Sequence, residues 1–163
     1  MDYRRLRAGD AAFWRDIRLE ALKTAPTAFG AVYENWADRP LSDFADWLEK
    51  SWLYAALDGD AACATLGWYR TGPRTESHRA SIIAAYVRPS ARGQQLMDRL
   101  YDAIRAELPD EILQLELEVA ADNFPAIAAY RRLGFDTTGR FPRAARHGDA
   151  FVDRLFMMRR LDA

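Results

Sequence analysis

The fold of this chain is decided by residues 79–119, RASIIAAYVRPSARGQQLMDRLYDAIRAELPDEILQLELEV. Residues 79–87 form an apolar run that Pro89 stops, which is typical of a strand. An apolar stripe at four-residue spacing follows and predicts a helix that Pro109 ends. From 113 to 119, apolar residues then alternate with polar ones, the two-residue period of a half-buried strand. A strand, a helix and a strand in this order predict two parallel strands joined by a right-handed crossover.

The segments before residue 79 add helices and a hairpin. Asp58, Gly59 and Asp60 separate two apolar stretches and are a strong short-range hairpin signal, so these stretches are predicted to pair antiparallel. The elements expected in this part are a strand over 3–6, a helix that Asp10 caps and Pro26 ends, a helix over 42–50, strands over 52–57 and 61–70, and a loop over 71–77.

The segments after residue 119 predict one more helix and a closing hairpin. Proline is common in the first turn of a helix, as at Pro125, and a glycine in the left-handed conformation commonly ends a helix, as expected at Gly134. A helix is therefore expected over 125–133. Strands over 135–141 and 151–159 flank a turn-rich stretch at 147–149. The chain contains no linker, repeat or low-complexity region, and we therefore predict a single mixed α/β domain over residues 1–163.

Composition excludes several classes of protein. Half of the 163 residues are apolar, and 23 Lys and Arg against 24 Asp and Glu give a formal charge of −1, which argues against a disordered chain or a general nucleic-acid binder. No apolar run is long enough to cross a membrane, and no apolar block follows the arginines of the first ten residues, so the expected location is the cytoplasm. One cysteine, Cys63, and two histidines exclude an internal disulfide and a zinc site rich in Cys or His, so no metal is expected.

The candidate site lies at residues 88–97. Ligands of open sheets bind beyond the carboxyl ends of parallel strands, beside the start of the next helix. Here several free backbone N–H groups are expected at a helix start, together with Gly93 and nearby arginines, and this combination suits a phosphate or pyrophosphate. An ordinary helix start without a ligand is the alternative explanation of the same residues.

At this point the sequence resembles the GNAT superfamily of N-acetyltransferases. The acetyl-CoA signature of that family, an Arg or Gln followed by x-x-Gly-x-Gly or Ala after a strand that ends in Val-x-Pro, is matched by Val87, Arg88, Pro89 and by Arg92, Gly93, Gln94, Gln95, Leu96 and Met97. The second region of the family, Leu-Glu-Val-x-x-x-Asn-x-x-Ala-Ile-x-x-Tyr-x-x-x-Gly-Phe, is matched by Leu117, Glu118, Val119, Asn123, Ala126, Ile127, Tyr130, Gly134 and Phe135. The stretch from Arg18 to Leu22 and the closing Phe151, Val152 and Asp153 also look like many members, so the resemblance covers nearly the whole chain.

The resemblance implies a mostly antiparallel central sheet flanked by helices, in which a splayed parallel strand pair holds CoA. It implies that Tyr86 and Val87 offer backbone groups to the pantetheine and the acetyl carbonyl, and that Asn123 holds the pantetheine arm. The pyrophosphate would be cradled by Arg92, Gly93, Gln94, Gln95, Leu96 and Met97. The acceptor pocket would draw on the aromatic segment that contains Phe29 and Tyr33, although such residues are also common in a core or a lid.

Two positions of the turn depart from the family pattern. Gln95 and Met97 stand where small residues are usual. Gln95 fits as long as its backbone keeps a negative φ, because the N–H group rather than the side chain contacts the phosphate. Met97 is large enough to push the helix away from the sheet.

The resemblance also implies the groups that move protons. An amine must lose a proton before it attacks a thioester, and Glu118 is the implied base; a solvated strand edge explains this glutamate as well. Tyr130 is the implied acid that protonates the departing thiolate, whereas on its own it would be a buried aromatic of a short helix. The two histidines lie in loops without a hydrolase-type serine turn, so they are not candidates.

The predicted function is therefore acetyl transfer from acetyl-CoA to a primary amine, small molecule or peptide, by direct attack in a ternary complex. A covalent acetyl-cysteine step is not expected, because Cys63 lies mid-strand without an activating partner. The alternative is a non-catalytic acyl-CoA-sensing or protein-binding module on the same fold, suggested by the altered turn. The sequence does not identify the acceptor and leaves a homodimer open.

Overall fold

The structure is a computed structural model that describes residues 1–163. Its helices are α1 (Ala11–Thr24), α2 (Glu34–Ala37), α3 (Leu41–Lys50), α4 (Leu96–Glu107) and α5 (Phe124–Arg132), with 3-10 turns η1 (Ala8–Asp10), η2 (Pro26–Ala28), η3 (Arg74–Glu76) and η4 (Pro89–Ala91). Its strands are β1 (Asp2–Arg5), β2 (Trp52–Asp58), β3 (Ala61–Arg70), β4 (Arg79–Val87), β5 (Gln114–Ala120), β6 (Asp136–His147) and β7 (Ala150–Arg160).

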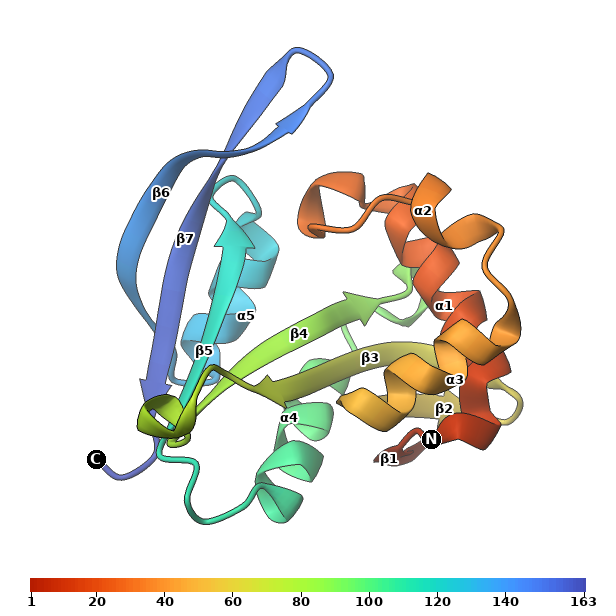
Figure 1. Ribbon diagram of the computed structural model, residues 1–163, viewed down its shortest axis with the longest axis horizontal. Helices are drawn as coiled ribbons and strands as arrows, with labels where there is room; N and C mark the ends of the chain where they lie inside the picture. The colour runs from red at the N-terminus through yellow and green to blue at the C-terminus, as the bar shows by residue number, and fades with distance from the viewer. The chain divides into compact units, whose positions relative to one another are not determined.

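The seven strands follow the order β1-β2-β3-β4-β5-β7-β6 (Figure 1). Strands β4 and β5 are parallel, with three residue pairs from Arg79↔Gln114 to Ser81↔Glu116, whereas the pairs β1–β2, β2–β3, β5–β7 and β6–β7 are antiparallel. This mixed, mostly antiparallel α/β architecture confirms the predicted fold class. It also confirms the hairpin around Gly59 and the parallel crossover through α4.

The chain forms two compact units. The first contains Met1–Tyr69 and Ile82–Leu108, and the second contains Arg70–Ser81 and Pro109–Ala163. Strand β4 contributes its first three residues to the second unit and the rest to the first.

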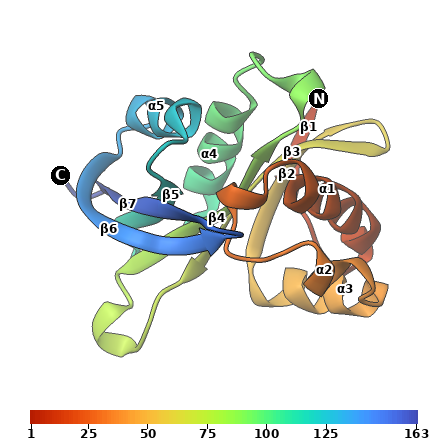
Figure 2. The same ribbon diagram turned by 90° about the horizontal axis from the view of Figure 1, so that it is seen from above.

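In the first unit, helices cover both faces of the strands. Helices α1 and α3 lie on one face and α4 on the other, as the two orthogonal views show (Figures 1 and 2). The stripe predicted for α4 is buried at Leu96, Leu100 and Ile104, because these positions repeat with the helical period. The unit holds every tryptophan of the chain, at positions 14, 36, 47, 52 and 68. Two tryptophan pairs stack, Trp14 on Trp47 at 4.7 Å and Trp52 on Trp68 at 4.3 Å between ring centroids.

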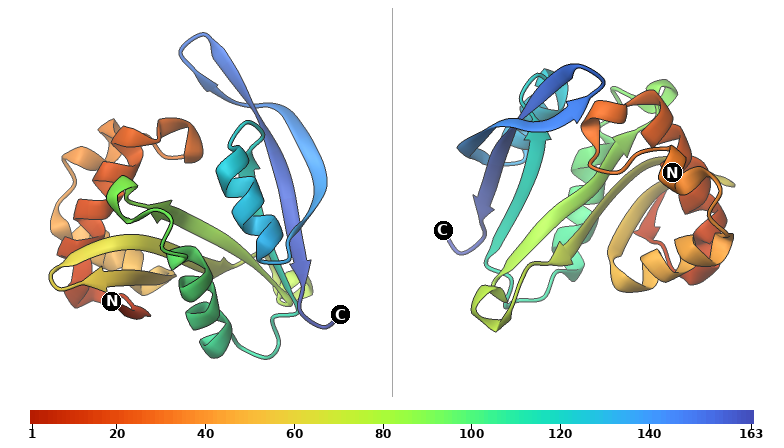
Figure 3. Two further views of the ribbon diagram at one scale, coloured as in Figure 1. Left: turned by 180° about the vertical axis from the view of Figure 1, so that it is seen from behind. Right: turned by 45° about the horizontal axis from the view of Figure 1, so that its top comes forward.

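In the second unit, α5 runs alongside β5 and β7 (Figure 3). The alternation read from the sequence is present in β5, where Leu115, Leu117 and Val119 are buried. On the opposite face Glu116 accepts hydrogen bonds from Arg79 at 2.9 and 2.6 Å, so an ion pair joins the first residue of β4 to the third residue of β5. Arg79 and Gln114 then hold the pKa of this carboxyl below its usual value, although burial opposes them.

Strand β6 extends further than predicted, to His147 instead of residue 141. The extra residues pair with β7 up to His147↔Ala150, after a register shift between Phe141 and Ala145. Most side chains of β6 are exposed, so the sequence of this strand lacks the alternation of apolar and polar residues that marks a half-buried strand. Pro142 also disfavours a strand at its position, because proline has no N–H group to donate. None of the helices is long and apolar enough to cross a membrane.

Candidate functional site

The end of β4 is irregular. Ala84 has a φ of 53°, a left-handed conformation that is rare for a residue other than glycine. The hydroxyl of Thr65 donates to the carbonyl oxygen of Ala84 at 2.8 Å, and the N–H of Arg88 donates to the carbonyl oxygen of Cys63 at 2.9 Å. The neighbouring strand thus holds β4 on both sides of the two residues, Tyr86 and Val87, that the sequence assigns to the cofactor.

The turn that follows β4 is open and rich in free N–H groups. Gly93 has a φ of +79°, and a Cβ placed on it would meet no atom within 4 Å. The backbone N–H groups of residues 93–97 donate to no acceptor within the chain. Arg92, Gln94 and Gln95 are exposed beside them. Unpaired N–H groups at a helix start attract anions, so this turn can accept a phosphate.

Gln95 does not meet the condition of a negative φ. Its φ is +56° and its ψ +28°, so it takes the left-handed conformation in place of a negative φ. The chain arrives extended at Arg92 and must turn into α4 within three residues, and Gln95 completes this turn at a cost of about 1–2 kcal/mol. Met97 is half-buried, and α4 packs on β1 and β2.

The structure adds a polar cluster that the sequence did not reveal. The Tyr86 hydroxyl donates to Glu20 at 3.0 Å and lies 2.9 Å from the hydroxyl of Thr24. Arg88 forms ion pairs with Glu20, at 3.4 Å, and with Asp16. Burial, with the hydrogen bond to Glu20, raises the pKa of Tyr86 above its usual value, so this hydroxyl stays protonated. The i, i+4 spacing of residues 16, 20 and 24 is the signal that could have shown one polar face of α1.

The two aromatic acceptor candidates lie in the first unit. The ring of Phe29 is tilted against that of Tyr86, with centroids 6.5 Å apart. Tyr33 precedes α2 and contacts the ammonium of Lys23 at 5.9 Å. Phe29 therefore contacts Tyr86 at the end of β4, and Tyr33 packs against the buried cluster that includes Tyr86.

In the second unit, Asn123 caps α5. Its side-chain oxygen accepts from the N–H of Ala126 at 3.3 Å, in the manner of an N-cap. The amide nitrogen of the same side chain has no partner within the chain. The residue therefore keeps two donors for a ligand while its oxygen stabilises the helix.

Tyr130 is buried in the same unit. It is 8% exposed and lies edge-on to Phe135 at 6.0 Å between centroids. Its hydroxyl makes no hydrogen bond within the chain, and burial raises its pKa to about 12. The hydroxyl is therefore protonated at every physiological pH and free to donate.

Glu118 lies on the exposed face of β5. Its side chain is 47% exposed and accepts from Arg154 of β7 at 3.2 Å. This is an exposed ion pair between neighbouring strands, and it leaves the second carboxylate oxygen free. The structure also gathers no group of three or more His, Cys, Asp or Glu residues that could hold a metal ion.

Comparisons with known proteins show the family of the chain. The model of the Acetyltransferase (GNAT) family matches residues 14–135. A mycothiol acetyltransferase from Pseudarthrobacter chlorophenolicus is 34% identical over 93 residues, which are 55% of this chain and 29% of that protein. The chain spans 39% of a second mycothiol acetyltransferase, from Brachybacterium faecium, so it covers less than half the length of these curated relatives.

Solved structures share the fold across the chain. The ribosomal-protein-alanine N-acetyltransferase from Brucella melitensis has a TM-score of 0.81 at 20% identity, covering 99% of this chain and 100% of that one. A putative acetyltransferase from Salmonella typhimurium, solved with its cofactor acetyl-CoA, has a TM-score of 0.80 at 19% identity, covering 100% and 95%. At sequence identities of 20% and 19%, the similarity to these two structures is evidence for a shared fold alone.

Proposed function

Because the chain belongs to the GNAT acetyltransferase family, we propose that it transfers an acetyl group from acetyl-CoA to a primary amine, with residues 1–163 acting as one acetyltransferase domain. The observation that carries this proposal is the turn after β4, where Gly93 is open and five consecutive N–H groups have no acceptor. The Salmonella neighbour was solved with acetyl-CoA, which supports the same cosubstrate here.

The residues present fit the parts of acetyl-CoA. The turn at residues 92–97 offers N–H donors and the Arg92 cation to the pyrophosphate. The backbone of Tyr86 and Val87 serves the pantetheine and the acetyl carbonyl. The free amide donors of Asn123 serve the pantetheine arm.

The reaction is direct attack. The neutral amine nitrogen attacks the thioester carbon, the new C–N bond forms, and the C–S bond breaks to release CoA as a thiolate. An amine has an unperturbed pKa of ~7.8 for an α-amine and ~10.4 for a lysine, so a base must take a proton. Glu118 takes it directly or through water, with the oxygen that Arg154 leaves free.

Tyr130 donates to the departing thiolate. Its pKa of about 12 keeps the proton in place, yet makes the phenol a weaker acid than an exposed tyrosine. A thiol has an unperturbed pKa of ~8.5, so complete transfer requires that the site also raise the basicity of the thiolate. Tyr130 therefore contributes mainly a hydrogen bond that strengthens as charge develops on sulfur.

Calorimetry with acetyl-CoA and release of free thiol over a panel of amines test the proposal. The panel contains amino acids, a peptide with an N-terminal alanine, and polyamines. We expect Tyr130→Phe to keep acetyl-CoA affinity and to lower kcat by on the order of 10²-fold or more. Tyr3→Phe removes a hydroxyl from edge strand β1 and is the matched control, with unchanged kcat.

The outcomes separate the candidates. Turnover that survives Tyr130→Phe would remove this residue as the acid. Tight binding of acetyl-CoA without turnover on any amine would favour the non-catalytic acyl-CoA-sensing module. Absence of acetyl-CoA binding would contradict both.

A further inference from the structure

Arg18 is a buried cation enclosed by aromatic rings. It lies on α1 and is only 8% exposed. Its guanidinium carbon lies over three rings, at 5.4 Å from Trp14, 5.3 Å from Phe29 and 5.4 Å from Trp36. The rings come from α1, from the segment after η2 and from α2, so three separate pieces of the first unit converge on one side chain.

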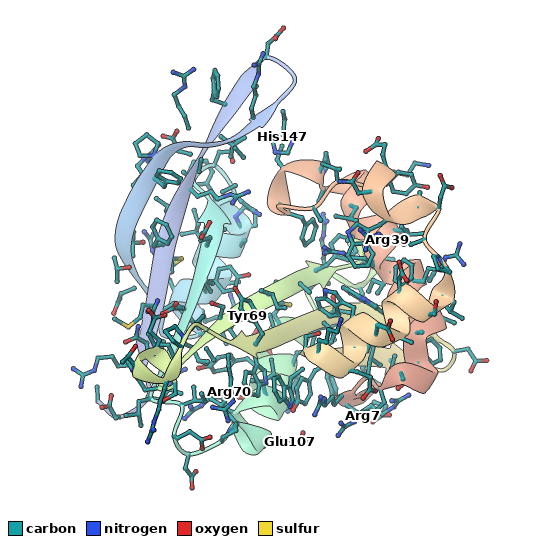
Figure 4. All side chains as sticks on the ribbon, viewed as in Figure 1. Arg7, Arg39, Tyr69, Arg70, Glu107 and His147 are labelled. Carbon is teal, nitrogen blue, oxygen red and sulfur yellow. The ribbon has the colours of Figure 1, made fainter.

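This cation has no counter-ion in the chain. The guanidinium makes no hydrogen bond or ion pair, and its Nε is fully buried without a partner. The acidic residues of the same helix, Asp16 and Glu20, are paired with Arg88. Arg39, labelled in Figure 4, adds a second guanidinium 4.7 Å from the Trp36 ring, so the surroundings are more positive still.

The arrangement is costly for a protein with nothing bound. Burial lowers the pKa of Arg18 to about 10, so it remains charged at neutral pH. A buried charge normally has an ionic partner, and cation–π contacts replace only part of the lost hydration. Unlike Nε, the terminal nitrogens are not among the atoms that are fully closed off from solvent.

Arg18 is close to the residues of the proposed reaction. Phe29, one of its three rings, also contacts the ring of Tyr86, which precedes Val87 at the end of β4. A group bound at Arg18 therefore lies one aromatic ring away from the strand end that is proposed to hold the acetyl carbonyl.

We propose that Arg18 binds the carboxylate of the acceptor, so that the preferred acceptor is an amine that also carries a carboxylate, as an amino acid does. This inference rests on the proposed acetyl transfer. A planar guanidinium donates two parallel hydrogen bonds to a carboxylate, and the three rings exclude water and fix its orientation. The carboxylate is the counter-ion that the chain itself lacks.

Acetylation of leucine and leucinamide tests the inference. The measured quantity is kcat/KM for leucine divided by kcat/KM for leucinamide. This ratio is compared between the wild type and each variant, because the difference in amine pKa between the two substrates is the same for every protein and cancels. We expect Arg18→Gln to lower this ratio about tenfold or more, because it removes a charged hydrogen-bond donor. Arg18→Lys keeps the charge without the planar fork, and we expect a smaller loss. Arg15→Gln removes an exposed arginine of the same helix and should leave the ratio unchanged.

A binding measurement decides the inference without turnover. N-acetylleucine and its amide are titrated calorimetrically into the protein saturated with CoA. We expect the wild type to bind the acid more tightly and Arg18→Gln to lose the preference. Equal binding of acid and amide by the wild type would overturn the inference, as would a preference that Arg18→Gln and Arg18→Lys both retain.

The result also separates this inference from the proposed function. Turnover of amines without preference for a carboxylate would contradict the role of Arg18 alone. Absence of turnover together with a carboxylate preference in calorimetry would contradict acetyl transfer and support the site. Thermal unfolding shows whether Arg18→Gln folds. If it does not fold, the preference for the acid over the amide is compared between the wild type and Arg18→Lys.

Discussion

At the scale of single residues, Asn123 combines a structural task with a proposed functional one. Its oxygen caps α5, while its amide nitrogen has no partner. Substitutions that remove one group or both can therefore separate the two tasks.

We expect Asn123→Ala to lower the free energy of unfolding by about 1 kcal/mol, because the cap is lost. Asn123→Asp keeps an accepting oxygen and should unfold like the wild type. Both variants lose the amide donors and should bind acetyl-CoA more weakly. Chemical denaturation and calorimetry measure the two effects, and an Asn123→Asp protein with wild-type affinity would remove this residue from the pantetheine site.

Single residues were also where prediction from sequence was least complete. Gly134 adopts the positive φ that was predicted for the end of its helix, and Gly93 adopts a positive φ as well. Gln95 adopts it too, and nothing in a glutamine signals this. Arg18 was visible only as part of a family pattern, because its three aromatic neighbours are joined by tertiary packing that no local spacing encodes.

At the scale of elements, β4, its turn and α4 were predictable because their signals are local. Proline at 89 and 109 and the four-residue stripe define the boundaries within one or two residues. Strand β6 was underestimated because an exposed, twisted hairpin has no buried face to impose alternation. The roles assigned to the turn remain predictions, and one pair of glycines can test them.

Gly93 and Gly148 offer that pair. Both have positive φ, +79° and +61°, and both have open space where a Cβ would lie. Substitution by alanine should therefore lower the free energy of unfolding by a similar amount, about 1 kcal/mol, through backbone strain alone. Only Gly93→Ala should also weaken acetyl-CoA binding, since only that turn presents free N–H groups to the cofactor. Equal affinity of the two variants, measured by calorimetry, would contradict the pyrophosphate role.

At the scale of the whole molecule, the predicted class of fold is present, with its parallel pair and its two hairpins. The order of elements was sufficient for this, because few topologies accommodate a crossover between flanking hairpins. The single domain predicted over residues 1–163 stays a prediction. We propose it on the ground that β4 is one continuous strand with residues in both units.

Because every tryptophan lies in the first unit, tryptophan fluorescence reports on the structure of only one of the two units. Indole fluorescence follows the unfolding of that unit alone, whereas far-UV ellipticity follows the helices and strands of both. For a single cooperative domain, we expect the two signals to change at the same denaturant concentration and with the same steepness. Two separate midpoints would mean that the second unit, which has no indole of its own, gains or loses its structure independently.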